Sequence, residues 1–251
     1  MTSSERGGGG APKPSPRNPP SPGPGPDPFK VYIEVNCFEI IAIILQIMVF
    51  NAPFTMICSG ATCSGKSEWV KRLIENRDEL IHPPVNSVLY CYGIITPKLL
   101  ELKGQENIEL HKGFPNIEDL YTNSLLILDD LMVDIEKAKS FLDSLFSRLS
   151  HHLGISVVFV TQSLFHKDLR LLKANTHYII LLRNPSSQQQ IRTLASQMYP
   201  GRGKFFIEAY NDATSKPYSY LAIDSHPQTA EQYRLSTNIF PGEQRIFYQP
   251  I

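Results

Sequence analysis

Short apolar runs alternate with amphipathic stretches along most of this chain. Residues 124–129 (SLLILD) and 155–160 (ISVVFV) are continuously hydrophobic, and residues 54–58, 87–92 and 177–182 are similar. Continuous rather than alternating hydrophobicity is typical of a strand that is buried on both faces, as in a parallel sheet. These runs therefore predict the strands of a buried, largely parallel sheet.

Helical periodicity fills the intervals between these strands. Residues 66–76, 134–152 and 188–198 each carry a stripe of apolar side chains, and Gly154 follows the second stripe at a C-cap-like position. Strands that alternate with helices predict an α/β fold with a mostly parallel sheet, flanking helices and right-handed crossovers. Weaker patterns add a brief helix and three short strands, at residues 97–102, 107–111, 218–224 and 244–248.

The N-terminal part breaks this pattern. Residues 1–30 are rich in Gly, Pro and Ser, so we expect a disordered tail that buries too little apolar surface to fold. Residues 31–52 contain an apolar core of about eleven residues, whereas a membrane-spanning helix needs roughly 20. Three interpretations of this segment are open: an edge strand or helix, a stretch foreign to the fold such as a gene-model error, or a membrane segment. The predicted domain occupies residues 53–251.

Charge and cysteine usage narrow the possible functions. The chain has 251 residues and a formal net charge of zero, from 24 basic and 24 acidic side chains. Any DNA contact must therefore come from a local patch, for which residues 98–112 are a candidate, or from an assembled ring. No cleavable signal peptide is apparent, and the cysteines lack zinc or C-x-x-C spacing. We expect an intracellular protein in nucleus, cytoplasm or virion, with reduced thiols at Cys37, Cys58, Cys63 and Cys91.

A phosphate-binding motif lies between the strand at 54–58 and the helix at 66–76. It fits the Walker A pattern G-x-x-x-x-G-K-[ST], which requires this strand–loop–helix context. Its glycines allow backbone N–H groups to approach a phosphate chain at a helix N-terminus. We expect Lys66 to reach the β- and γ-phosphates of ATP and the Ser67 hydroxyl to bind Mg²⁺. The predicted nucleotide-binding residues are Gly60, Ala61, Thr62, Cys63, Ser64, Gly65, Lys66 and Ser67.

Polar residues follow two of the buried runs. Asp129 and Asp130 end the run at 124–129, where the first carboxylate would hold Mg²⁺ and the second would orient or deprotonate the attacking water. Gln162 follows the run at 155–160 and would read the γ-phosphate or its water. Each residue alone also fits a plain structural role, as an acidic strand end or the start of a loop. The phosphate-binding motif upstream favours the functional interpretation.

The chain resembles the DNA-packaging ATPases of the FtsK–HerA superfamily, in particular the branch of Polinton/Maverick elements and adintoviruses. The resemblance rests on the phosphate-binding motif, on residues 125–132 (LLILDDLM) as a Walker B element, and especially on residues 145–170 and 175–200. It implies a RecA-like P-loop NTPase that forms a hexameric or pentameric ring. It also implies ATP-driven translocation of double-stranded DNA into a capsid, with capsid or portal-like partners.

The same resemblance implies roles for individual residues. Lys66 and Ser67 would contact phosphate and Mg²⁺, Asp129 would hold Mg²⁺, and Asp130 would be the catalytic carboxylate. Gln162 would be the sensor at the strand end, and Arg170, ahead of Arg148, would act on a neighbouring subunit's nucleotide. The superfamily commonly has Glu in place of Asp130, and residues 31–50 have no counterpart in it.

Two other functions are open. A P-loop kinase acting on a small phosphate acceptor would be active as a monomer and would need a mobile arginine-rich lid, of which the sequence shows no convincing example. A degenerate copy would bind nucleotide without turnover; the intact Lys66, Ser67 and Asp129 argue against it, and the unusual N-terminal segment argues for it.

Overall fold

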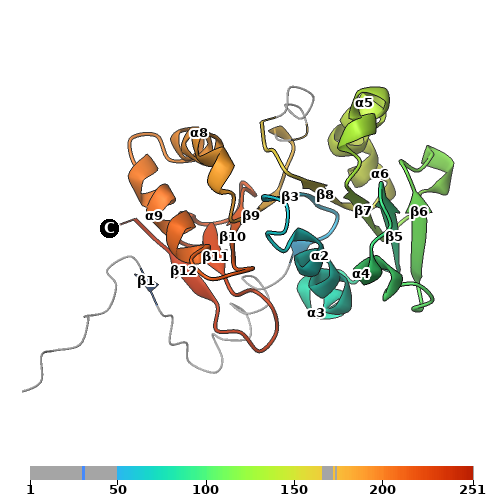
Figure 1. The fold of residues 1–251 in the computed structure, drawn as a ribbon, viewed down its shortest axis with the longest axis horizontal. Helices are drawn as coiled ribbons and strands as arrows, with labels where there is room; N and C mark the ends of the chain where they lie inside the picture. The colour runs from blue at the N-terminus through green and yellow to red at the C-terminus, as the bar shows by residue number, and fades with distance from the viewer. Residues whose placement is uncertain (1–29, 32–49, 166–171, 173, 251) are drawn as a thin grey trace, which may run out of the picture.

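A ten-stranded sheet forms the centre of the molecule (Figure 1). The computed structural model describes residues 30–31, 50–165, 172 and 174–250. The expectations for residues 1–29, for residues 32–49 and for Arg170 lie outside this part of the chain. The strand order across the sheet is β1-β12-β11-β10-β9-β3-β8-β7-β5-β6.

The strand that leads into the phosphate-binding motif lies in the middle of the sheet. This strand, β3 (Thr55–Ser59), pairs in parallel with β8 (Ser156–Thr161) on one side and with β9 (Tyr178–Leu182) on the other. Every residue of these three strands is buried, as continuous hydrophobicity predicts. The parallel part continues through β7 (Ser124–Asp129), β5 (Ser87–Tyr92) and β6 (Ile108–Lys112).

Beyond β9 the sheet is antiparallel. The strands there are β10 (Tyr220–Asp224), β11 (Leu235–Thr237), β12 (Ile246–Tyr248) and β1 (Lys30–Val31). A separate parallel pair joins β2 (Phe50–Asn51) to β4 (Ile81–His82), and Phe50 is buried in the core. The structured chain therefore includes residues that precede position 53.

Helices cover both faces of the sheet. On one face, α2 (Lys66–Glu75) buries Trp69, Val70, Leu73 and Ile74 in one cluster with Met56 and Cys58 of β3. The opposite face is covered in two places, by α5 (Ile135–Ser144) with α6 (Ser150–Leu153) and by α8 (Gln188–Met198) with α9 (Gly203–Ala213). Because neighbouring β3 residues point to opposite faces, Ile57 joins the α8 and α9 cluster. The predicted α/β P-loop fold with a RecA-like, mostly parallel sheet is confirmed.

Several elements differ from the prediction. The stretch 134–152 is interrupted by a π-helix at Leu145–Leu149, and α9 and β11 were not predicted. Helix α9 has the helical spacing Phe205, Phe206, Ala209, Tyr210 and Ala213, all buried, which could have revealed it. Among the described residues, further short helices are α3 (Arg77–Leu80), α4 (Pro97–Leu100), and 3-10 turns at Ile117–Asp119, Met132–Asp134, Pro185–Ser187 and Glu231–Tyr233.

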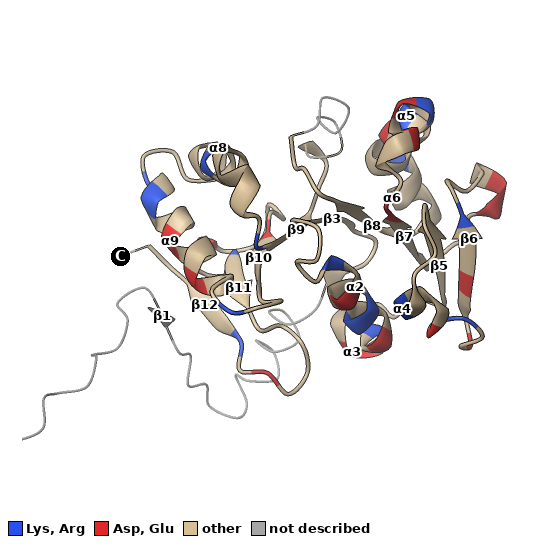
Figure 2. Ribbon diagram, in the orientation of Figure 1, with Lys and Arg blue, Asp and Glu red and all other residues tan. Residues whose placement is uncertain are grey.

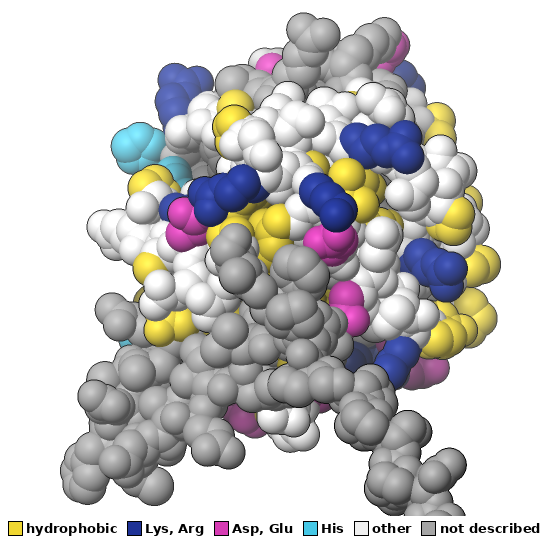
Figure 3. Space-filling model, turned by 90° about the vertical axis from the view of Figure 1, so that its left-hand side faces the viewer, with side chains coloured by type: hydrophobic (Ala, Val, Ile, Leu, Met, Phe, Trp, Pro, Cys, Tyr) yellow, Lys and Arg dark blue, Asp and Glu magenta, His cyan; other side chains and the backbone are white. Residues whose placement is uncertain are grey.

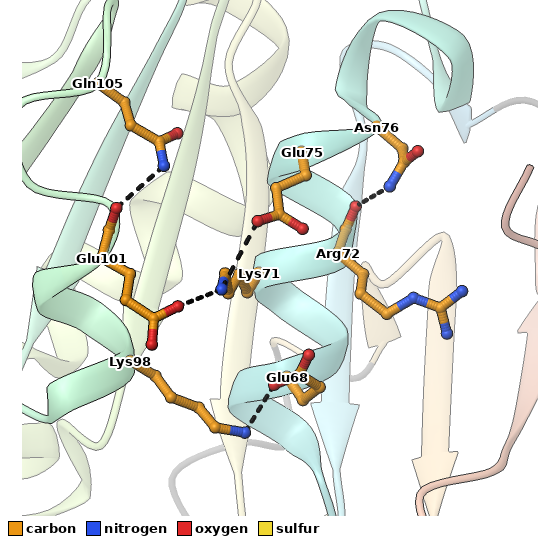
Figure 4. A network of polar contacts seen from close by, with 8 residues as sticks. All are labelled: Glu68, Lys71, Arg72, Glu75, Asn76, Lys98, Glu101 and Gln105. Atoms are coloured by element: carbon orange, nitrogen blue, oxygen red, sulfur yellow. Dashed lines mark hydrogen bonds and ion pairs between the residues drawn. The ribbon is translucent and has the colours of Figure 1, made fainter.

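Charged residues lie mainly on the helices and loops, and the central strands carry few of them (Figure 2). Some of these charges tie α4 to α2 (Figure 4): Lys98 Nζ lies 2.6 Å from Glu68 Oε2, and Lys71 pairs with Glu101 and Glu75. Lys98, in the candidate DNA-contacting region, therefore already has an acidic partner. Within the described residues, no helix has the length and apolar character needed to cross a membrane.

Candidate active site

The phosphate loop runs from Gly60 to Ser67 and connects β3 to α2, as the sequence predicts. Its first residues are fixed to the ends of both neighbouring strands. Gly60 N donates a hydrogen bond to Thr161 O at 3.3 Å, and Ala61 N donates to Arg183 O at 3.4 Å. The loop is therefore anchored at the carboxyl edge of the parallel strands, where ligands of open α/β sheets bind.

The two glycines of the loop meet different physical requirements. Gly65 has φ of 103°, a left-handed conformation that L side chains rarely adopt, and it immediately precedes α2. At Gly60, a Cβ would lie 2.8 Å from Leu182 Cβ and 2.5 Å from Ser64 Oγ. Gly65 is thus required for backbone conformation and Gly60 for space.

Lys66 holds its ammonium group inside the loop. Its Nζ donates hydrogen bonds to Gly60 O and to Ala61 O, both at 2.8 Å. Burial lowers the pKa of Lys66, and the nearby carboxylates Asp129 and Asp130 oppose that change. The ammonium group of Lys66 therefore lies within the loop that would bind the phosphate chain, and it is close to the carboxylates of Asp129 and Asp130.

Asp129 lies beside the phosphate loop, near Lys66 and Ser67. Its carboxylate accepts a hydrogen bond from Tyr90 Oη at 2.7 Å, and the Ser67 hydroxyl lies close enough to lower its pKa. Burial raises the pKa of Asp129, and so does the nearby Asp130 charge, while the Tyr90 hydrogen bond, the Lys66 charge and the nearby Ser67 hydroxyl lower it. A hydroxyl and a carboxylate oxygen brought together in this way fit Mg²⁺, which prefers hard oxygen ligands. When bound, the ion would neutralise phosphate charge.

Asp130 has a strained backbone. It is exposed, and its φ of 56° is uncommon for a residue with a side chain. Gly93, in the loop after β5, lies against it: a Cβ at Gly93 would be 2.1 Å from Asp130 O, and Gly93 N donates to Asp129 O at 3.0 Å. Such strain is of order 1–3 kcal/mol and is found at functional sites when the surrounding structure enforces it. Sequence analysis missed Gly93, although a glycine directly after a buried strand is a recognisable signal.

Gln162 is exposed and directly follows Thr161, the last residue of β8, whose backbone oxygen accepts a hydrogen bond from Gly60 N of the phosphate loop. The backbone oxygen of Gln162 accepts a hydrogen bond from Asn184 Nδ2 at 3.1 Å. Asn184 is buried, and its own N–H donates to Tyr210 Oη at 3.0 Å. Asn184 and Tyr210 therefore fix the position of Gln162, and sequence analysis identified neither.

Three arginines, Arg148, Arg170 and Arg183, differ in their relation to the loop. Arg183 is exposed and its carbonyl oxygen contacts Ala61 N, so its backbone adjoins the phosphate loop. Arg148 is exposed on the π-helix. Arg170 lies outside the described residues. The assignment of an arginine that acts on a neighbouring subunit remains a prediction.

The Tyr90 hydrogen bond gives a pH-dependent prediction. It favours the ionised form of Asp129, so the Tyr90→Phe variant raises the pKa of Asp129 further. Because the carboxylate is the form that binds Mg²⁺, we expect the acid limb of the pH–rate profile for Mg²⁺-dependent ATP hydrolysis to move to higher pH. Tyr121→Phe removes the hydroxyl of an exposed residue that precedes the amino end of β7; it is the control and should leave the limb unchanged. A Tyr90→Phe profile that overlays the wild-type profile would contradict this role.

Comparisons with known proteins find similarity only among solved structures. No protein-family model matches this chain, and no curated protein does. The cytoplasmic domain of the Thermomonospora curvata type VII secretion ATPase EccC has a TM-score of 0.48 and 17% identity, over 78% of this chain and 25% of that one. This chain therefore spans about a quarter of the EccC chain.

A viral protein and an archaeal one are also similar. The genome packaging NTPase B204 from Sulfolobus turreted icosahedral virus 2, in complex with ATP-γS, has a TM-score of 0.45 and 13% identity, over 79% of this chain and 98% of that one. The KaiC-like protein PH0186 from Pyrococcus horikoshii has a TM-score of 0.42 and 11% identity, over 79% of this chain and 91% of that one. All three TM-scores are below 0.5, so the functional argument rests on the site itself.

Proposed function

We propose that this protein is an Mg²⁺-dependent ATPase. The observation that carries the proposal is that the phosphate loop, which follows β3, and Asp129, the last residue of β7, meet at one edge of the sheet. Cys58 of β3 and Asp129 both pair with Val160 of β8, and Lys66 of the loop lies close to Asp129. This arrangement joins the two elements that phosphoryl-transfer enzymes use to hold Mg²⁺ beside the phosphates. Lys66 lies in the same loop, and Asp130 follows Asp129 on a strained turn.

The chemistry of such a site is positioning combined with charge stabilisation. The loop N–H groups and Lys66 would stabilise charge on the transferring phosphoryl group. The exposed Asp130 carboxylate would orient or deprotonate the attacking water, and Gln162 would contact the γ-phosphate or that water. In contrast to a flexible surface acid, Asp130 is held by the close approach of Gly93.

We further propose that ATP hydrolysis drives translocation of double-stranded DNA. The narrower form of this proposal is that the protein packages a viral genome into a capsid. The support is the sequence resemblance at residues 145–170 and 175–200. Basic side chains on the face that carries α8 and α9 are dispersed among other residue types (Figure 3). That dispersion fits a DNA contact built by a homo-oligomeric ring, in which Arg170 or Arg148 would act on a neighbour's nucleotide. Capsid or portal-like proteins would be the further partners.

ATP hydrolysis by the full chain tests this proposal. It is measured with and without double-stranded DNA, over a series of protein concentrations, with Lys66→Ala as the blank. Specific activity that rises with protein concentration and with DNA supports a ring-forming motor. Hydrolysis at constant specific activity without DNA stimulation favours a kinase, and nucleotide binding without turnover favours a degenerate copy.

A further inference from the structure

An exposed tyrosine lies against the phosphate loop. Tyr218 is 69% exposed, which is unusual for a large aromatic side chain. A Cβ built on Gly65 would lie 2.9 Å from Tyr218 Cδ1 and 3.3 Å from Tyr218 Cβ. The missing side chain at Gly65 therefore lets the tyrosine approach the backbone of the loop where it enters α2.

The fold fixes this placement of Tyr218. The residue lies between α9 and β10, in a turn in which Ser219 N and Ser219 Oγ both donate to Lys216 O, at 3.3 Å and 2.7 Å. Because β10 runs antiparallel to β9 and Tyr220 pairs with Leu182, the turn lies at the carboxyl end of β9. The backbone N–H of Ala61, in the phosphate loop, donates a hydrogen bond to the oxygen of Arg183, the residue that follows that end. Tyr218 and the loop therefore occupy the same edge of the sheet.

The backbone conformation of Tyr218 is unfavourable for an aromatic residue. Its φ of 65° lies in the left-handed region. Burial does not account for it, since most of the side chain faces solvent. A flat, exposed aromatic ring at a rigid turn is well suited to stack on a nucleobase, because every base presents a π-face.

We propose that Tyr218 stacks on the base of the nucleotide whose phosphates are bound by residues 60–67. This inference rests on the proposed nucleotide-binding function and adds a base-contacting residue to it. Stacking does not depend on the hydrogen-bonding groups of the base. Tyr218 therefore contributes affinity for nucleosides over bare polyphosphate, with little preference between purine bases.

Calorimetric titrations with Mg–ATP and with inorganic tripolyphosphate distinguish stacking of Tyr218 on the base from an effect of Tyr218 on the conformation of the phosphate loop. Tyr218→Ala is expected to weaken ATP binding by roughly tenfold and to leave tripolyphosphate binding unchanged. Tyr218→Phe retains the ring and should bind ATP as the wild type does. Tyr121→Ala removes another exposed tyrosine, 52% exposed and outside the loop, and should change neither ligand.

The outcomes distinguish failure of this inference from failure of the proposed function. Unchanged ATP affinity in Tyr218→Ala overturns the stacking role alone. An equal loss of ATP and tripolyphosphate binding also overturns it, because Tyr218 would then act only through the conformation of the loop. A wild-type protein that binds neither ligand overturns the proposed nucleotide-binding function and the inference with it.

Discussion

Replacing Asp130 by asparagine is expected to slow ATP hydrolysis by roughly 10²- to 10⁴-fold, the usual contribution of a positioned general base. The amide keeps the shape of the side chain and cannot accept a proton from water. Asp130 is exposed, whereas Asp129 accepts the Tyr90 hydrogen bond and lies close to Lys66 and Ser67. ATP binding by Asp130→Asn should therefore stay close to the wild-type value, which equilibrium titration with Mg–ATP measures.

Two further variants make this experiment specific. Asp134→Asn removes an exposed carboxylate of the following 3-10 turn, paired with Lys137, and should leave the hydrolysis rate unchanged. Asp130→Glu keeps a carboxylate at this position and should retain more activity than Asp130→Asn. Wild-type turnover in Asp130→Asn would exclude Asp130 as the catalytic carboxylate.

Replacing Gly93 by alanine is expected to reduce hydrolysis nearly as much, although Gly93 contributes no side chain. The new Cβ would lie 2.1 Å from Asp130 O, a distance that real Cβ atoms essentially never show. The neighbouring atom belongs to the backbone, so the turn at Asp130 must move and displace the carboxylate. Overpacking of this kind typically costs about 1–3 kcal/mol, so the midpoint of urea unfolding should also fall.

Gly203→Ala is the matched control for this variant. Its Cβ would meet Ala195 Cβ at 3.7 Å, an ordinary van der Waals contact, so activity and stability should stay near wild type. Comparison of hydrolysis with the unfolding midpoint separates lost geometry from lost folding. If Gly93→Ala folds stably and hydrolyses ATP at the wild-type rate, Gly93 does not position Asp130.

The residues that carry the predicted chemistry were found from sequence because their signal is local. The phosphate loop has a fixed spacing between a buried strand and an amphipathic helix, and both flanks are present as β3 and α2. Asp129 and Gln162 end or follow continuous apolar runs, and such runs form the centre of the sheet. Their catalytic roles remain predictions.

Residues that support the site came only from the structure. Gly93, Tyr90 and Asn184 are distant in sequence from the residues they contact, so no spacing rule could join them. Tyr218 reaches Gly65 only because β10 returns antiparallel beside β9. Of the antiparallel strands, β10 and β12 lie within predicted runs, whereas β11 was missed because it is only three residues long and carries little periodicity.

The sequence by itself determined the parallel centre of the fold and the positions of the phosphate loop and of Asp129 along the strands. It did so because burial on both faces demands uninterrupted apolar strands, and phosphate binding demands glycines and a lysine at fixed positions. The tertiary structure alone decided which atoms meet at the edge of the sheet. These contacts depend on strand register and on the close packing of backbone against backbone, as at Gly93 and Asp130. Local residue patterns predict neither of them.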